Sequence, residues 1–163
     1  MPCGHAPSRP NPEYDHDHDN DLHPRVGLMN ISYSSNDEIE TTEVVDLYTA
    51  NNWSSAKKPD ALIAALRNSH SLITARFESQ LVGLGNALSD GHLVVYYPHL
   101  IVHPDYQRQG IGRAIMQRMS KKYGQLHQQI LVADGAAMAF YKSMGFQPAG
   151  HTQSMWIYQG DEH

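Results

Sequence analysis

The segment from Leu100 to Ala114 combines residue types and spacing that suit the binding of an anionic ligand. Its apolar start indicates the end of a strand, and Gly110 and Gly112 then open a helix. Glycine leaves no side chain between the backbone and a ligand. The first N–H groups of a helix have no partners inside it and carry the positive end of the helix dipole, so they suit a pyrophosphate. Arg108 and Arg113 add positive charge nearby, and an arginine can hold phosphate through two hydrogen bonds.

Other interpretations of these glycines stay open on the residues alone. They also fit a plain strand–turn–helix in which glycine only eases packing. A dinucleotide-binding G-x-G-x-x-G turn needs glycine or alanine where Ile115 stands, and an acidic residue after a strand about twenty residues later. A nucleotide-binding P-loop needs the sequence G-K-S/T, which the chain lacks here. Both nucleotide interpretations are therefore weak.

A second segment with chemical potential runs from Asp134 to Phe146. It is rich in alanine, carries Phe140 and Tyr141, and predicts a short helix that Gly145 ends. The ordinary pKa of tyrosine is about 10, so its hydroxyl can donate a proton at neutral pH. Taken alone, the two aromatic residues equally fit the core side chains of a short helix.

Together the two segments resemble the signatures of the Gcn5-related N-acetyltransferase (GNAT) superfamily, and of its bacterial members in particular. The run Gln107-Arg108-Gln109-Gly110-Ile111-Gly112 is similar to the family's Q/R-x-x-G-x-G/A signature. The run from Phe140 to Phe146 is similar to the family's F-Y-x-x-x-G-F helix end. The resemblance spans roughly residues 31–158 and is strongest between residues 100 and 146.

The resemblance implies acetyl-CoA as the cofactor, held by its pyrophosphate at the glycine turn and by its pantetheine arm along the preceding strand. It also implies that Tyr141 protonates the departing coenzyme A thiolate. One departure is Asp134, where many relatives have an asparagine; an ionised carboxylate accepts hydrogen bonds but cannot donate them. The cofactor-binding residues implied are Leu100, Ile101, Val102, Gln107, Arg108, Gln109, Gly110, Ile111, Gly112, Arg113, Asp134, Ala137, Phe140 and Tyr141.

A primary amine has a pKa of about 10, so its proton must leave before it can attack the acetyl group. Relatives often place a glutamate on the strand before the turn, and that position falls on Tyr96, a poor base. His99 lies on the same strand, and the ordinary histidine pKa of about 6.5 suits a base. Alternation puts His99 and Tyr96 on opposite faces unless a bulge at Pro98 re-aims the histidine. His99 also fits a structural histidine bonded to the backbone.

The resemblance places the acceptor amine beside the first two predicted helices. Tyr48 and Trp53 are the candidate substrate residues there, because an aromatic ring can stack on a cation. Glu43 and Asp46 could attract a cationic amine. The same residues also fit a solvated helix face and a core tryptophan.

Hydrophobic periodicity predicts the elements that position these residues. It alternates between helix and strand from residue 31 onward, which indicates a mixed α/β fold. The resemblance adds a single GNAT-like domain, with a mostly antiparallel sheet of six to seven strands that splays into a V between its middle strands, flanked by about four helices. The predicted strands are 31–34, 71–77, 81–88, 92–102 and 129–133, with one or two more in 146–158, and the predicted helices are 37–50, one from residue 59, 110–124 and 136–144.

Composition limits the class of protein. The 163 residues suit one domain, and 40% hydrophobic residues suit a soluble globular protein. The formal charge of −5 argues against a nucleic-acid binder. No apolar run approaches the ~20 residues that a membrane span needs, and no secretory signal is visible. Cys3 is the only cysteine, which favours a reducing, cytoplasmic setting.

The N-terminal residues 1–28 differ from the rest, and the acetyltransferase domain is predicted over residues 29–160. Four of the eleven histidines lie in the first 23 residues among several aspartates, with few apolar side chains, which indicates a flexible tail. The run from Asp15 to Asp19 could bind a divalent metal weakly or be simply solvated. No defined metal site is predicted.

The sequence thus predicts an N-acetyltransferase that moves an acetyl group from acetyl-CoA to a primary amine of a small molecule or peptide, by direct attack in a ternary complex. A non-catalytic acyl-CoA sensor is the alternative, and a metal-binding protein built on the tail is a third hypothesis. Family expectation adds a homodimer.

Overall fold

The computed structural model describes residues 30–36 and 38–160. In chain order the helices (α), 3-10 helices (η) and strands (β) are β1 (Ile31–Ser35), α1 (Thr41–Ala50), η1 (Ser54–Lys57), α2 (Pro59–Arg67), β2 (Ser71–Phe77), β3 (Gln80–Ser89), β4 (Val94–Tyr97), β5 (Leu100–Val102), η2 (Pro104–Tyr106), α3 (Ile111–Tyr123), β6 (Gln128–Leu131), η3 (Gly135–Ala137) and α4 (Met138–Ser143). None of the described helices has the length and apolar character that crossing a membrane requires.

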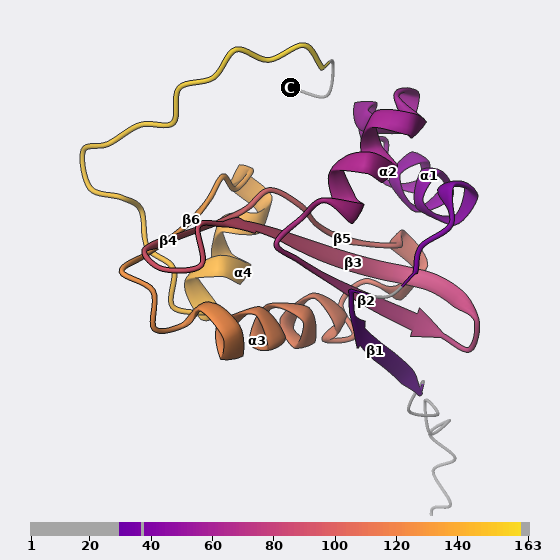
Figure 1. Ribbon diagram of the computed structural model, residues 1–163. Helices are drawn as coiled ribbons and strands as arrows, with labels where there is room; N and C mark the ends of the chain where they lie inside the picture. The colour runs from indigo at the N-terminus through magenta and orange to yellow at the C-terminus, as the bar shows by residue number, and fades with distance from the viewer. Residues whose placement is uncertain (1–29, 37, 161–163) are drawn as a thin grey trace, which may run out of the picture.

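The six strands form one sheet in the order β1-β2-β3-β4-β6, with β5 paired to β3 beside β4. The β4–β6 pair is parallel and the others are antiparallel. Helices α1 and α2 cover one face of the sheet, and α3 and α4 lie on the other (Figure 1). The mixed α/β class, the mostly antiparallel sheet and the four α-helices predicted from the sequence are confirmed.

Each face of the sheet has its own hydrophobic core. One core joins α1 and α2 to the sheet through residues such as Leu47, Leu66 and Ile101. The other packs α3 on the opposite face and includes Val95 and Ile115. This assignment of side chains to the two cores shows which way each strand residue faces.

A β-bulge separates β4 from β5. On β3, Leu88 is opposite Tyr96, whereas Gly85 is opposite Leu100. One extra residue therefore lies on the β4–β5 side, at Pro98 and His99. Asn86 closes the gap: its backbone N–H donates to the His99 carbonyl at 3.1 Å, and its side-chain Oδ1 accepts from the His99 N–H at 3.1 Å. The bulge predicted from Pro98 is thus present, since a proline cannot donate to the ladder.

The sheet opens beyond this bulge. β6 pairs with β4 as far as Tyr97 and Leu131. In the described part of the chain β5 pairs with β3, which lies on the side of β5 away from the opening. Among the strands that the structure describes, β5 and β6 are therefore not paired with each other, and the sheet is open between its middle strands.

The strands predicted in residues 146–158 are absent from the described structure. This segment leads away from the sheet (Figure 1), and the side chains of Met155 and Ile157 are 95% and 99% exposed. Hydrogen bonds from the Gly150 N–H to the Pro148 carbonyl and from the Thr152 N–H to the Ala149 carbonyl form turns that redirect the chain. A strand pattern without a neighbouring strand makes no sheet hydrogen bonds, so this prediction was wrong.

The start of the first helix also differs from the prediction. The helix is capped at Glu40, whose N–H donates to the Glu43 carboxylate at 3.0 Å. Asn36, directly before the predicted helix 37–50, has a positive φ of 54° and accepts a hydrogen bond from the Leu72 N–H at 3.1 Å. The predicted N-terminal tail, residues 1–28, and its weak metal-binding run lie outside the described residues.

Candidate active site

The glycine turn lies between η2 and α3, next to the end of β5. Gly110 caps α3 with a φ of 84°, a left-handed conformation that side chains with a Cβ rarely adopt. A Cβ built on Gly110 has no protein atom within 4 Å, so the space above this residue is open. His103 stabilises η2, because its Nδ1 accepts from the Asp105 N–H at 3.3 Å. The turn is therefore exposed at Gly110.

The backbone amides of the turn are available to a ligand. The first hydrogen bond of the helix runs from the Ala114 N–H to the Gly110 carbonyl at 2.9 Å. Within residues 30–36 and 38–160, no protein acceptor is recorded for the backbone N–H groups of residues 108–113. Residues 108–110 are also exposed. Such unpaired amides at a helix entry fit a pyrophosphate group.

Two side chains predicted to bind the cofactor also make contacts with the protein, and their cofactor contacts stay predictions. Gln107 donates through Nε2 to the Val102 carbonyl at 3.0 Å and to Asn51 Oδ1 at 3.2 Å, which ties the turn to β5 and to the end of α1. Arg113 donates to Ser143 Oγ at 2.7 Å, which ties α3 to α4. Arg108, with a positive φ of 62°, stays exposed on the turn. Both arginines therefore carry positive charge within the run of unpaired amides, and the Arg113 guanidinium is held by neutral partners at the end of α4.

Tyr141 lies on α4, next to the turn. A Cβ built on Gly112 would lie 3.7 Å from Phe140 Cζ, so α4 packs directly against the start of α3. The Tyr141 ring is half-buried between Phe140 and Phe146, with ring centroids 5.0 Å and 6.0 Å away. Burial raises the pKa of Tyr141, so its phenol stays protonated at neutral pH. Tyr141 also lines a hollow alongside Leu131 of β6. The sequence-predicted acid is thus close to the opening of the sheet.

Asp134 precedes η3, and Ala137 is its last residue. The Ala137 N–H donates to the main-chain carbonyl of Asp134 at 2.9 Å, and the Asp134 side chain is exposed and caps no helix amide. A cofactor contact at these two positions stays a prediction.

The bulge brings both candidate bases to one face of the sheet. Val95 of β4 belongs to the core under α3, whereas Ile101 of β5 belongs to the core under α1 and α2. Simple alternation would put these two residues on the same face, so the extra residue reverses the pattern. Tyr96 and His99 therefore both face α1 and α2, the side on which the resemblance places the acceptor.

His99 lies in an aromatic cluster with Tyr48 and Trp53. The Tyr48 hydroxyl is 2.7 Å from His99 Nδ1, and the Trp53 ring packs edge-on to His99 with centroids 5.3 Å apart. Tyr48 is 0% exposed, so an acceptor cannot contact it, and the predicted substrate contact at Tyr48 is wrong. Trp53 is half-buried and remains accessible.

Glu43, predicted to attract an amine, is occupied by a salt bridge. Both of its carboxylate oxygens accept from Arg76, at 2.7 Å and 2.8 Å. The hydrogen bonds with Arg76 are the main cause that lowers the pKa of Glu43. This pair fastens α1 to β2. Asp46 is exposed on the same helix.

Sequence reasoning missed two contacts that shape the site. The Tyr48–His99 bond joins residues far apart in the chain, and the Arg113–Ser143 bond joins two helices. No local pattern signals either one. The proline at 98 did signal the bulge that makes the first contact feasible.

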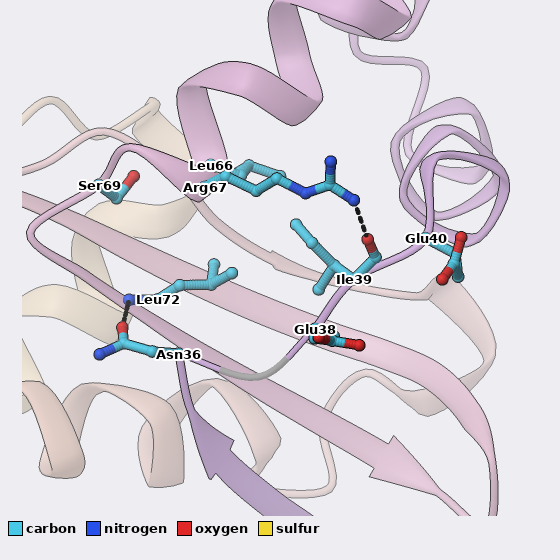
Figure 2. A pocket seen from close by; sticks show the side chains of 8 residues that line it. All are labelled: Asn36, Glu38, Ile39, Glu40, Leu66, Arg67, Ser69 and Leu72. Carbon is cyan, nitrogen blue, oxygen red and sulfur yellow. Dashed lines mark hydrogen bonds between the residues drawn. The ribbon is translucent and has the colours of Figure 1, made fainter.

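A second hollow lies between the β1–α1 connection and α2, apart from the turn (Figure 2). Two hydrogen bonds join parts of its lining: Arg67 donates to the Ile39 carbonyl at 2.9 Å, and Asn36 accepts from the Leu72 N–H. None of the predicted site residues lines it. Among the residues that the structure describes, no group of three or more His, Cys, Asp or Glu side chains could hold a metal ion.

A sheet that opens beside a glycine-rich helix entry, with a tyrosine-bearing helix next to it, is the arrangement that the resemblance implies for an acyl-CoA-dependent acyltransferase. Residues 33–156 match the family described as "Acetyltransferase (GNAT) domain". The chain therefore belongs to the GNAT family and is an N-acetyltransferase, as the sequence predicted.

Relatives and solved structures agree with this assignment. The chain is 28% identical over 141 residues to "Uncharacterized N-acetyltransferase ycf52" of Pyropia yezoensis, covering 81% of this chain and 80% of the relative. It is 36% identical over 56 residues to "[Ribosomal protein bS18]-alanine N-acetyltransferase" of Escherichia coli K12, covering 31% and 38%. The structure of the GNAT family protein SP0256 from Streptococcus pneumoniae superposes with a TM-score of 0.69 at 30% identity, covering 79% of this chain and 98% of that one.

Proposed function

We propose that this enzyme transfers an acetyl group from acetyl-CoA to a primary amine of a small molecule or peptide, by direct attack within a ternary complex. The observation that carries the proposal is the set of unpaired backbone N–H groups at residues 108–113, on an exposed turn at the entry of α3. Six neighbouring amides that have no protein acceptor in the described part of the chain suit a strongly anionic group.

Acetyl-CoA supplies an acetyl group that is activated as a thioester. The amides of residues 108–113 bind its pyrophosphate, and the exposed Arg108 adds positive charge. The backbone of β5 borders the opening of the sheet on the side away from β3, where the Val102 carbonyl accepts from Gln107 and the other polar groups of β5 suit the amides of the pantetheine arm. Gly110 allows a close approach, because nothing occupies the space where a Cβ would lie.

Tyr141 is proposed as the general acid. Its pKa is raised by burial, so the phenol holds its proton throughout the neutral range and can deliver it to the departing thiol. The packing of Phe140 against Gly112 keeps the tyrosine helix in contact with the cofactor turn. The same contact keeps the acid beside the bound thioester.

The acceptor is proposed to enter from the α1 and α2 face. Tyr96 and His99 face this side, and the half-buried Trp53 packs against His99 there. The name of the Escherichia coli relative gives an alanine of a ribosomal protein as its acceptor. Peptides with a free N-terminal amine therefore belong in the test panel beside small amines.

The test measures thiol release from acetyl-CoA with that panel, comparing the wild type with Tyr141→Phe. We expect turnover with at least one primary amine and a fall in kcat of about 10²-fold or more in the variant, the usual contribution of a general acid. Unchanged turnover in the variant would exclude Tyr141 as the acid. Tight binding of acetyl-CoA without turnover on the whole panel would favour the non-catalytic sensor.

We further propose that the enzyme works in the cytoplasm as a homodimer. The single cysteine suits a reducing compartment, and dimer formation rests on family expectation alone. Light scattering on the eluting protein measures the mass directly, and a monomer mass would overturn the second proposal.

A further inference from the structure

The contact between α1 and the bulge fixes more than the position of His99. The backbone of His99 is bonded to Asn86 at both its N–H and its carbonyl. Asn86 is 3% exposed, and its Nδ2 donates to Ser69 Oγ at 2.9 Å. The rings of Tyr48 and Trp53 then pack edge-on against the imidazole, with centroids 5.5 Å and 5.3 Å away. The orientation of the imidazole is therefore set before any substrate binds.

The hydroxyl of Tyr48 determines which imidazole nitrogen carries a proton. Tyr48 is 0% exposed, and among the described residues its hydroxyl has one hydrogen-bond partner, His99 Nδ1 at 2.7 Å. A buried O–H requires an acceptor. Burial also raises the pKa of Tyr48, so the hydroxyl keeps its proton. The O–H bond therefore donates to His99 Nδ1, and a neutral imidazole that accepts at Nδ1 carries its hydrogen on Nε2.

We propose that Tyr48 is a positioning residue that holds neutral His99 in the tautomer with its hydrogen on Nε2, so that His99 acts as a hydrogen-bond donor and not as the base. The donor role rests on the proposed acetyl transfer, whereas the tautomer belongs to the protein itself. In this tautomer the basic lone pair is on Nδ1, and it is already engaged by Tyr48. His99 can take up a proton only by breaking that bond and leaving the buried Tyr48 hydrogen without an acceptor. The amine must therefore lose its proton to water or to another group.

His70 provides an internal comparison. Its Nδ1 also lies 2.7 Å from a buried tyrosine hydroxyl, that of Tyr123. The Tyr123 hydroxyl has a second partner, Ser71 Oγ at 2.7 Å, which can accept its hydrogen. The tautomer of His70 is therefore not determined in the same way. Of these two histidines, only His99 is expected to be held in a single tautomer by its tyrosine.

The first experiment records long-range proton–nitrogen NMR spectra of protein labelled with ¹⁵N-histidine, without acetyl-CoA. The His99 signals are assigned by their loss in His99→Gln. In the wild type we expect the ¹⁵N chemical shift of His99 Nδ1 to lie in the range of an unprotonated nitrogen and that of Nε2 in the range of a protonated one. In Tyr48→Phe we expect the shifts of a mixture of tautomers for His99, with the His70 shifts unchanged. Protonated Nδ1 in the wild type, or the same His99 spectrum in Tyr48→Phe, would overturn the proposal. Because no substrate is added, the result does not depend on whether the proposed function is correct.

The second experiment compares the acetylation rates of His99→Gln and His99→Ala, with the amine from the test panel that the wild type acetylates. The glutamine amide can replace an Nε2–H donor but cannot act as a base. We expect His99→Gln to stay within about tenfold of the wild type and His99→Ala to be slower, whereas loss of a general base costs about 10²–10⁴-fold in both. Equal losses of that size in the two variants would overturn the donor role. Circular dichroism melting of each variant verifies that it is folded.

Discussion

Replacing Gly110 by alanine perturbs the cofactor turn at one atom. Gly110 has a φ of 84°, and a Cβ built there meets no protein atom within 4 Å. The substitution therefore adds no clash within the protein. Its effects are the strain of a left-handed residue and a methyl group in the space where the proposed cofactor approaches.

The size of both effects follows from this geometry. A left-handed conformation costs a non-glycine residue about 1–2 kcal/mol, which lowers the midpoint of thermal unfolding by roughly 4 °C per kcal/mol. If the methyl group prevents one amide from reaching the pyrophosphate, the lost charge-assisted hydrogen bond is worth about 1.5–3 kcal/mol. The dissociation constant of coenzyme A should then rise about 10- to 100-fold.

Gly91→Ala is the matched control. Gly91 also has a positive φ, 77°, and its nearest neighbour to a built Cβ is His70 Nε2 at 3.6 Å, an ordinary contact. Isothermal titration calorimetry with coenzyme A and thermal unfolding are measured on both variants. We expect similar losses of thermal stability but weakened binding in Gly110→Ala only. Wild-type affinity in Gly110→Ala, or an equal loss of affinity in Gly91→Ala, would refute the role of the turn.

Three further predictions concern single side chains. Glu43→Gln should lower the free energy of unfolding by about 1–3 kcal/mol, since it breaks a partly buried bidentate pair with Arg76; chemical denaturation measures this. The pKa of Glu43 is lowered in the folded state, so the extra unfolding free energy of the wild type is present above the unfolded pKa of 4.5 and should vanish as pH falls through the folded-state pKa. A difference in unfolding free energy that does not change with pH would contradict this prediction. The pKa of Tyr48 is raised, so the stability of the wild type should fall as pH rises above 10, and Tyr48→Phe should show a flatter alkaline limb in pH-dependent denaturation; equal slopes would argue against the burial effect. Trp53→Ala should raise KM for the amine while leaving KM for acetyl-CoA within about twofold, as expected for a ring that contacts only one substrate; an equal rise in both values would remove Trp53 from the acceptor site.

The sequence predicted those features whose backbone conformation is determined by residues close together in the chain. The glycine turn could be predicted because glycine, proline and the following apolar stripe each fix the backbone nearby. The strands of the hairpin from Ser71 to Ser89 were predicted closely, since their apolar runs are bounded by a turn at Glu78, which adopts a positive φ of 53°. Pro98 signalled the bulge for the same reason.

The features that the sequence did not predict depend on contacts between segments far apart in the chain. The residue type of Tyr48 fits a substrate pocket and a core equally well. Its burial depends on the bulge, which places His99 against its hydroxyl. Arg113 has a charge that suits a phosphate, but Ser143 on another helix binds it. The apolar run that includes Met155 and Ile157 resembles a strand, but a strand exists only where a partner lies beside it.

The most direct test of the central claim is a titration of ¹⁵N-labelled protein with coenzyme A, followed by amide chemical shifts. If the unpaired amides at the entry of α3 bind the pyrophosphate, the largest shifts should fall on residues 108–113, with smaller ones along β5. Saturable binding whose shifts spare these six amides, or no shifts at all at millimolar ligand, would contradict the account.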